Sequence, residues 1–151
     1  MHARMAFPDS VMNDTATGVQ HLYKAMYRSG APQEVLELVH LRASQLNGCS
    51  ACVNAGVESA QKAGETDERL HQLAAWYEAP QFTEAERAAL ELTEVATRLA
   101  DGGRVPDAVY DAAAAHYSEE QLAGIILMIA ATNFFNRLNA SIRVPAGTRW
   151  N

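Results

Sequence analysis

The sequence contains no run of basic residues. Its 12 Lys and Arg are scattered and are outnumbered by 18 Asp and Glu, which gives a formal net charge of −6 and a pI near 5.3. Binding to nucleic acid or to an anionic membrane surface through charge needs clustered Lys and Arg. The composition therefore predicts a protein without a nucleic-acid partner.

Long apolar runs are also missing. The longest run, residues 125–131, is far shorter than the ~20 residues that a membrane helix needs. Residues 1–9 mix His, Arg and Pro and lack the apolar centre of a signal peptide. We therefore expect no membrane partner and a cytoplasmic location.

Cysteine is scarce, and both cysteines, Cys49 and Cys52, lie in one Cys-x-x-Cys motif. Zinc usually takes four ligands, and the sequence has neither a second cysteine pair nor a closely spaced histidine pair. A disulfide across two intervening residues constrains the unfolded chain too little to act as a staple. We favour a redox-active pair that needs no metal or other cofactor. Half of a zinc site and two unreactive buried thiols remain alternatives.

Alternating strand patterns are absent, whereas helix signals are frequent. The expected helices cover, approximately, residues 17–28, 32–47, 49–63, 66–78, 83–101, 105–117 and 118–141. A chain of 151 residues with 48% hydrophobic residues can bury one core. The sequence therefore predicts an all-α fold, a compact bundle of six or seven helices that forms a single domain over residues 1–151.

Helix boundaries are marked by specific local signals. Capping boxes at residues 83–86 and 118–121 predict two helix starts, and Pro32 suits the first turn of another helix. Asn47-Gly48 predicts a helix end, so the next helix should begin at Cys49 or Ser50. That helix is rich in small residues, which predicts a close approach to a neighbouring helix.

The cysteine pair lies where a thiol is activated. A thiol reacts as its thiolate, and a helix N-terminus lowers the thiol pKa because the unpaired N–H groups favour negative charge. A redox thiol also needs a proton relay. Glu37, twelve residues before Cys49, and His40, one turn after Glu37, are the candidates. The alternatives are a solvated carboxylate at Glu37 and a surface imidazole at His40.

Residues 37–52 read Glu-Leu-Val-His-Leu-Arg-Ala-Ser-Gln-Leu-Asn-Gly-Cys-Ser-Ala-Cys. This segment resembles the core of the AhpD-like alkyl hydroperoxidases, which belong to the carboxymuconolactone decarboxylase superfamily. Residues 133–139, Asn-Phe-Phe-Asn-Arg-Leu-Asn, are similar to the C-terminal helix of that family. The resemblance covers approximately residues 15–143 and implies an AhpD-like helical fold.

The resemblance implies a thiol-dependent oxidoreductase of the peroxidase type. Cys52 would attack the hydroperoxide, Cys49 would resolve the product as a disulfide, and Glu37 would belong to the proton relay. The implied partners are a hydroperoxide or disulfide substrate, a thiol reductant protein and further copies of the chain, as a trimer or hexamer. The alternatives are a redox sensor, a disulfide reductase, and a lyase or decarboxylase of the wider superfamily.

One position departs from the family pattern. The family has a histidine four residues after the second cysteine, where this chain has Gly56. We expect a weak peroxidase in which water or His40 replaces that imidazole, unless the empty volume at Gly56 admits a bulky substrate. Asn133, Asn136 and Asn139 are spaced by three residues on the last helix. We favour helix–helix hydrogen bonds for these amides, with a lining for the cysteine pocket as the alternative.

Overall fold

A computed structural model describes residues 2–8 and 12–148. Within these residues there are eight α-helices, one 3₁₀ helix and no strand, so the all-α prediction is confirmed. The elements are α2 (Asn13–Arg28), α3 (Gln33–Leu46), α4 (Ser50–Lys62), α5 (Asp67–Gln72), η1 (Leu73–Ala75), α6 (Glu84–Thr97), α7 (Leu99–Gly102), α8 (Asp107–Ala114) and α9 (Glu119–Ile142).

The helix count exceeds the predicted six or seven because two predicted helices are divided. The segment 66–78 forms α5 and then the 3₁₀ helix η1. The segment 83–101 breaks at Arg98, where the backbone leaves helical geometry with φ −100° and ψ 34°. Both predicted capping boxes are present, at Thr83 with Glu86 and at Ser118 with Gln121. The capping motifs therefore predicted where helices start more accurately than hydrophobic periodicity predicted where they continue unbroken.

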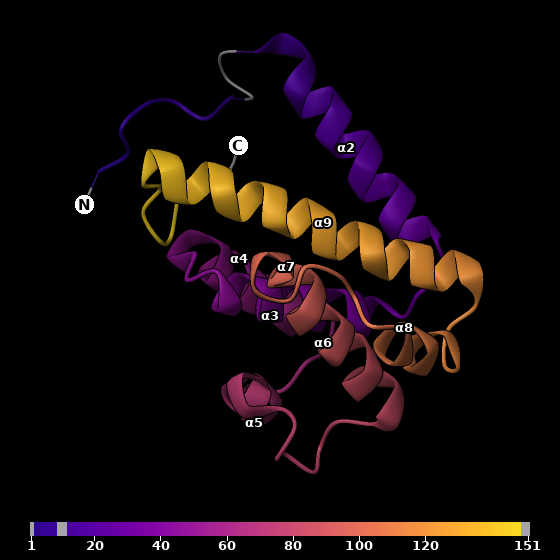
Figure 1. The fold of residues 1–151 in the computed structure, drawn as a ribbon. Coiled ribbons are helices and arrows are strands. Elements are labelled where there is room, and N and C mark those ends of the chain that lie inside the picture. The colour runs from indigo at the N-terminus through magenta and orange to yellow at the C-terminus, as the bar shows by residue number, and fades with distance from the viewer. Residues whose placement is uncertain (1, 9–11, 149–151) are drawn as a thin grey trace.

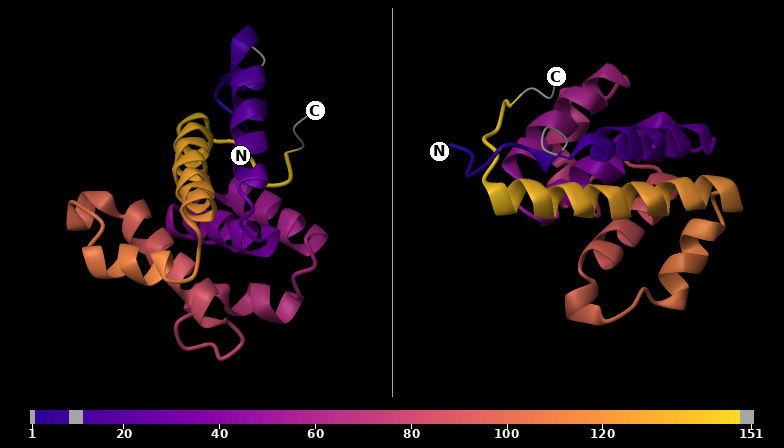
Figure 2. Two further views of the ribbon diagram at one scale, coloured as in Figure 1. Left: turned by 90° about the vertical axis from the view of Figure 1, so that its right-hand side faces the viewer. Right: turned by 90° about the horizontal axis from the view of Figure 1, so that it is seen from above.

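Helix α9 runs the length of the molecule, and other helices pack around it (Figure 1). It packs against α2, α3, α4, α6 and α8. Seen from above, α2 and α4 lie on one side of α9 and the α6–α8 region lies on the other (Figure 2). Helix α3 contacts α4, α6 and α9, so the segment that carries the predicted motif lies at the centre of the fold.

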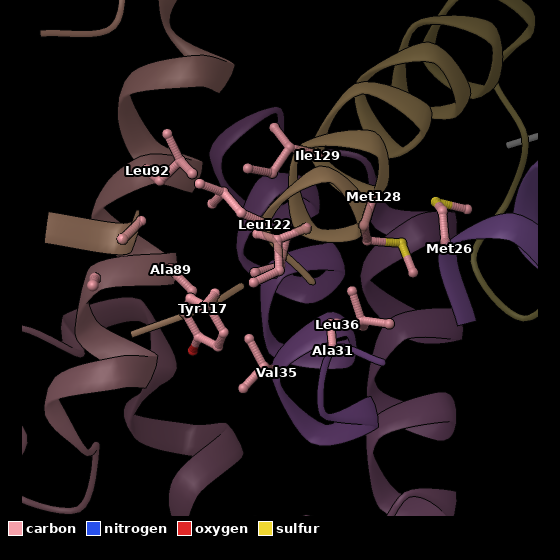
Figure 3. Packing of buried hydrophobic residues seen from close by; sticks show 14 of the residues in the cluster. Met26, Ala31, Val35, Leu36, Ala89, Leu92, Tyr117, Leu122, Met128 and Ile129 are labelled. Atoms are coloured by element: carbon pink, nitrogen blue, oxygen red, sulfur yellow. The ribbon is translucent and has the colours of Figure 1, made fainter. Parts of the chain in front are cut away.

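The main hydrophobic core fills the space between α3, α6 and α9 (Figure 3). Leu36, Leu92, Ile125 and Met128 are at most 1% exposed in this cluster. By length and composition, α9 is the one helix in the described part of the chain that could cross a membrane. One such helix is weak evidence for a membrane span, and α9 contacts five other helices.

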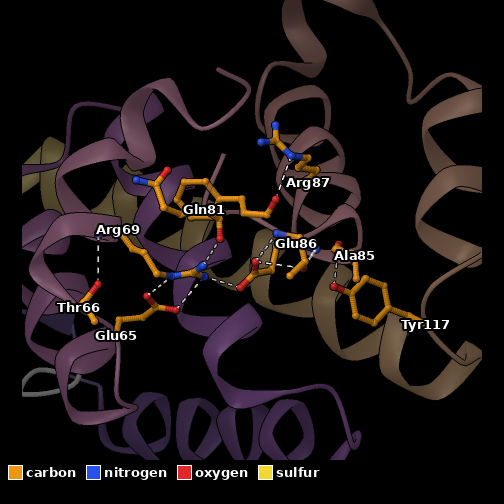
Figure 4. Close-up of polar contacts among 10 residues, drawn as sticks. Glu65, Thr66, Arg69, Gln81, Ala85, Glu86, Arg87 and Tyr117 are labelled. Carbon is orange, nitrogen blue, oxygen red and sulfur yellow. Dashed lines mark hydrogen bonds and ion pairs between the residues drawn. The ribbon is translucent and has the colours of Figure 1, made fainter. Parts of the chain in front are cut away.

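A polar cluster around Arg69 joins α5 to the start of α6 (Figure 4). The Arg69 guanidinium donates to Glu65 Oε2 at 2.7 Å and forms an ion pair with Glu86. Glu86 also accepts from the Thr83 backbone N–H at 2.7 Å through its capping box. Each carboxylate oxygen of Glu65 and Glu86 has a partner, so these two carboxylates hold the two elements together.

Candidate active site

The turn between α3 and α4 delivers the cysteines to the site. Gly48 adopts a left-handed φ of +64°, and its N–H donates to Gln45 O. The Cys49 N–H donates to Ser44 O at 3.1 Å, which completes a Schellman ending of α3. The predicted stop at Asn47-Gly48 is thus confirmed, and it makes Cys49 the N-cap of α4.

Cys49 and Cys52 form a disulfide with a Cα–Cα distance of 5.3 Å. Both residues are buried, and each sulfur accepts one hydrogen bond. Cys49 Sγ accepts from the Cys52 backbone N–H at 3.3 Å, whereas Cys52 Sγ accepts from Asn139 Nδ2 at 3.1 Å. The Cys49 sulfur therefore has a backbone donor, whereas the Cys52 sulfur has a side-chain donor from another helix.

A cavity of about 280 Å³ lies beside the disulfide, and Cys52 is the cysteine that lines it. Helices α2, α3, α4 and α9 and the N-terminal segment enclose this cavity. Its lining residues are Phe7, Thr15, Ala16, Val19, Tyr23, His40, Cys52, Ala55, Phe135 and Asn139. The lining is mainly apolar, and the rings of Tyr23 and Phe135 have centroids 6.0 Å apart. A small organic molecule could therefore reach the Cys52 sulfur through apolar surroundings.

Glu37 lies behind this cavity and is 1% exposed. The hydroxyl of Tyr27, on α2, donates to Glu37 Oε1 at 2.6 Å. Glu37 Oε2 is buried and has no hydrogen-bond partner among the residues that the structure describes. The solvated alternative for Glu37 is therefore wrong, because the side chain is enclosed and one of its oxygens is left to accept a proton or a hydrogen bond.

His40 joins the carboxylate to the cavity. Its Nδ1 lies 4.0 Å from Glu37 Oε2, its side chain is 17% exposed, and it lines the same cavity as Cys52. On its other side, His40 lines an open polar depression of about 910 Å³ together with Tyr27 and Ser59. An imidazole in this position contacts both the cysteine cavity and a solvent-facing surface, and it needs only a small movement to hydrogen-bond Glu37.

The electrostatics of the site keep Glu37 ionised. Burial alone raises the pKa of its carboxyl, but the interactions with His40, Tyr27 and Ser59 outweigh burial and hold the pKa below 4.5. Burial and the Glu37 charge raise the pKa of Tyr23 to about 12 and raise that of Tyr27 as well. Both phenols are therefore neutral near pH 7, and the Glu37 carboxylate is ionised there.

Gly56 does not leave empty volume, so that expectation was wrong. A Cβ at this position would lie 3.2 Å from Leu41 Cδ1 and 3.4 Å from Leu41 Cα. Gly56 allows α4 to approach α3 closely, as the small residues of this helix predicted. The cavity beside Cys52 is instead lined by the preceding residue, Ala55.

The three asparagines of α9 divide into two kinds. Asn136 donates to Ser44 Oγ and accepts from Asn47, and Asn133 also accepts from Asn47, as expected for helix–helix hydrogen bonds. Asn139 contacts the Cys52 sulfur, so the pocket-lining alternative holds for this residue. Tyr27 was missed, and no local motif in the sequence marks it.

The described residues gather no group of three or more His, Cys, Asp or Glu side chains that could hold a metal ion. The cysteine pair therefore has no third and fourth ligand within residues 2–8 and 12–148. Half of a zinc site is not supported, and the arrangement suits thiol–disulfide chemistry.

The chain is similar to known proteins in sequence and in fold. The model of the carboxymuconolactone decarboxylase family matches residues 14–95. The uncharacterized protein YdfG of Bacillus subtilis is 41% identical over 113 residues, which are 75% of this chain and 76% of YdfG. The uncharacterized protein YnjA of Escherichia coli is 32% identical over 120 residues, which are 79% of this chain and 64% of YnjA.

One solved structure covers almost the whole chain. It is a protein of unknown function from Agrobacterium tumefaciens, whose name suggests an antioxidant defence protein AhpD. The two share a TM-score of 0.88 and 28% sequence identity, over 97% of this chain and 99% of that chain. The AhpD-like helical fold expected from residues 37–52 is thereby confirmed.

Proposed function

Because the chain belongs to the carboxymuconolactone decarboxylase family, we propose that it is a dithiol oxidoreductase that reduces hydroperoxides with Cys52 and Cys49. The observation that carries this proposal is the buried Cys49–Cys52 disulfide, of which Cys52 lines a cavity shared with His40. The position of Cys52 at the cavity supports it as the attacking sulfur, and the position of Cys49 behind it supports a resolving role.

The reaction balances as follows. The Cys52 thiolate attacks the outer oxygen of the hydroperoxide and breaks the O–O bond, which leaves Cys52 as a sulfenic acid and releases an alkoxide that takes a proton to become the alcohol. The Cys49 thiol then displaces water from the sulfenic acid and closes the disulfide. Two thiols of a reductant protein reopen the disulfide and are themselves oxidised to a disulfide.

Glu37 and His40 would handle the protons of this cycle. His40 lines the cavity and can give a proton to the departing alkoxide or take one from the Cys52 thiol. The Glu37 carboxylate, 4.0 Å from the imidazole, would exchange a proton with it during the cycle. In this proposal His40, on α3, supplies the imidazole that the family pattern places on the next helix.

A reducing compartment such as the cytoplasm would supply the thiol reductant. A redox sensor or disulfide reductase would use the same cysteine pair and needs no hydroperoxide. A lyase needs acid–base groups without a thiol pair, so the disulfide beside the cavity argues against that alternative.

The decisive experiment exposes the reduced protein to an organic hydroperoxide and follows peroxide loss and thiol loss together. The wild-type chain should consume one equivalent and form the disulfide. Cys49→Ser should stop at a sulfenic acid on Cys52, and Cys52→Ser should consume none. A reduced protein that leaves the hydroperoxide intact, yet whose disulfide is rapidly reduced by thiols, would replace this proposal with a sensor or disulfide reductase.

We also propose that the chain forms a homo-oligomer. Ile126 and Phe134, both on α9, are 41% and 48% exposed, and covering them against another chain would bury apolar surface. A second copy of the chain could cover them. Light scattering at micromolar concentration should return a multiple of the 16.4 kDa chain mass, and a monomer mass would contradict the proposal.

A further inference from the structure

The side-chain amide of Asn139 reaches the Cys52 sulfur from α9. Its Nδ2 donates to Cys52 Sγ at 3.1 Å, and the residue is 6% exposed. Cys49 Sγ accepts instead from the backbone N–H of Cys52, a donor that persists in any variant that keeps the first turn of α4. The hydrogen bond that distinguishes the two sulfurs therefore depends on one side chain.

The oxygen of the same amide has no partner. Asn139 Oδ1 is buried, and no donor reaches it among the residues that the structure describes. A buried amide oxygen without a donor is unfavourable, so its place beside the disulfide needs a reason. Reduction supplies one, because opening the disulfide with two electrons and two protons gives Cys52 an S–H group. A half-turn of the amide would then present Oδ1 to that proton in place of Nδ2.

We infer that Asn139 is a positioning residue that holds the Cys52 sulfur in both of its reduced forms. The amide donates to the thiolate and accepts from the thiol. A hydrogen bond to a charged sulfur is stronger than one to a neutral sulfur, so the net effect favours the thiolate at Cys52 and leaves Cys49 unaffected. The inference rests on the proposed function only in taking Cys52 as the attacking sulfur.

Other groups also act on Cys52 and must be separated from the amide. His40 and Tyr23 line the same cavity, and Glu37 lies 4.0 Å behind His40. These groups remain in place when Asn139 is replaced. A comparison of the same replacement in two single-cysteine proteins therefore isolates the contribution of the amide.

The test uses the full chain with Asn139→Leu in a Cys49→Ser background and in a Cys52→Ser background. The pH dependence of alkylation by iodoacetamide reports the thiolate fraction of the remaining cysteine. Because hydrogen bonds to charged groups correspond to about one pKa unit, we expect the Cys52 thiolate fraction at pH 7 to fall roughly tenfold. The Cys49 fraction should stay within about twofold. Equal changes at both cysteines, or none at Cys52, would overturn the inference.

Asn136→Leu provides the matched control. It removes a buried amide one turn earlier on α9, whose partners are Asn47 and Ser44, and it should leave the Cys52 fraction unchanged. If Asn139→Leu fails to fold, Asn139→Asp keeps the shape and replaces the donor with an oxygen, so the thiolate fraction should also fall. An unchanged fraction in that variant would overturn the inference.

Peroxide consumption is measured separately, on the chain that retains both cysteines. A chain that consumes no hydroperoxide would end the proposed function, whereas the alkylation result would still decide the role of Asn139. Conversely, normal peroxide consumption without a differential change in the thiolate fraction would show that Asn139 does not act on Cys52. The proposed function would then remain intact.

Discussion

The partly buried carboxylates of Glu65 and Glu86 and the buried carboxylate of Glu37 have opposite surroundings. Glu65 and Glu86 flank Arg69, and each of their oxygens has a hydrogen-bond or ion-pair partner. Glu37 accepts from Tyr27 on one oxygen, and no donor in the described part of the chain makes a hydrogen bond to the other. The imidazole Nδ1 of His40 lies 4.0 Å from that second oxygen.

This difference in pairing distinguishes carboxylates that stabilise the fold from a carboxylate that can take part in proton transfer. A carboxylate that is fully paired with a guanidinium stabilises one arrangement and has no capacity to exchange a proton. A buried carboxylate with a free oxygen beside an imidazole contributes little to packing but can exchange protons with its neighbour. We therefore expect replacements in the Arg69 cluster to lower stability and replacements around Glu37 to lower the reaction rate.

Glu37→Gln should produce the largest effect. It keeps the shape and the Tyr27 contact but removes the carboxylate that would exchange a proton with His40, so the rate of Cys52 oxidation by hydroperoxide should fall about 10²–10⁴-fold. The unfolding free energy should change by less than about 1 kcal/mol. Stopped-flow oxidation and urea denaturation measure the two quantities. Glu65→Gln is the matched control and should show the reverse pattern, and an unchanged rate in Glu37→Gln would remove the carboxylate from the relay.

Arg69→Met should have the next largest effect, and on stability alone. It leaves Glu65 and Glu86 partly buried without their cation, which should lower the unfolding free energy by about 2–4 kcal/mol. Urea denaturation of the oxidised protein would measure the loss. The rate of Cys52 oxidation should remain within about twofold, and a large loss of rate would show that the two clusters are coupled.

Gly56→His tests whether the missing family histidine can be restored. Because a Cβ at position 56 would press against Leu41, we expect a loss of about 1–3 kcal/mol in unfolding free energy and no gain in rate. Ala55→His is the control, since Ala55 lines the cavity and its replacement should cost less stability. A stable Gly56→His protein that reacts faster would restore the expectation of an incomplete relay.

The smallest predicted effect is on the stability of the fold at low pH. The pKa of Glu37 is lower in the folded chain than its ordinary value of 4.5, so its ionisation stabilises the fold above that value. This contribution is lost as the pH falls from about 4.5 through the lower folded pKa. Urea midpoints at pH 7 and pH 3 should therefore differ less in Glu37→Gln than in the wild-type chain. An equal difference in both proteins would show that Glu37 makes no net contribution to stability.

Much of the fold was readable from the sequence because its signals are local. The capping boxes at Thr83 and Ser118 and the Asn47-Gly48 stop depend on residues within one turn of each other, and all three are present in the structure. The breaks at η1 and Arg98 were missed, because periodicity continues through them while the backbone departs from the helix. The close approach of α4 to another helix was predicted from its small residues, but the empty volume expected at Gly56 was wrong because Leu41, on α3, lies against it.

The sequence by itself determined the chemistry that this protein can offer, a cysteine pair at a helix start, because the turn that forms that start is encoded within residues 44–52. The tertiary structure decided which of the candidate groups contact the pair and added one that the sequence did not mark. Asn139 reaches Cys52 across 87 positions of sequence, and Tyr27 reaches Glu37 from a different helix. Such contacts follow from how α2 and α9 pack against α3 and α4, and no local pattern specifies that packing.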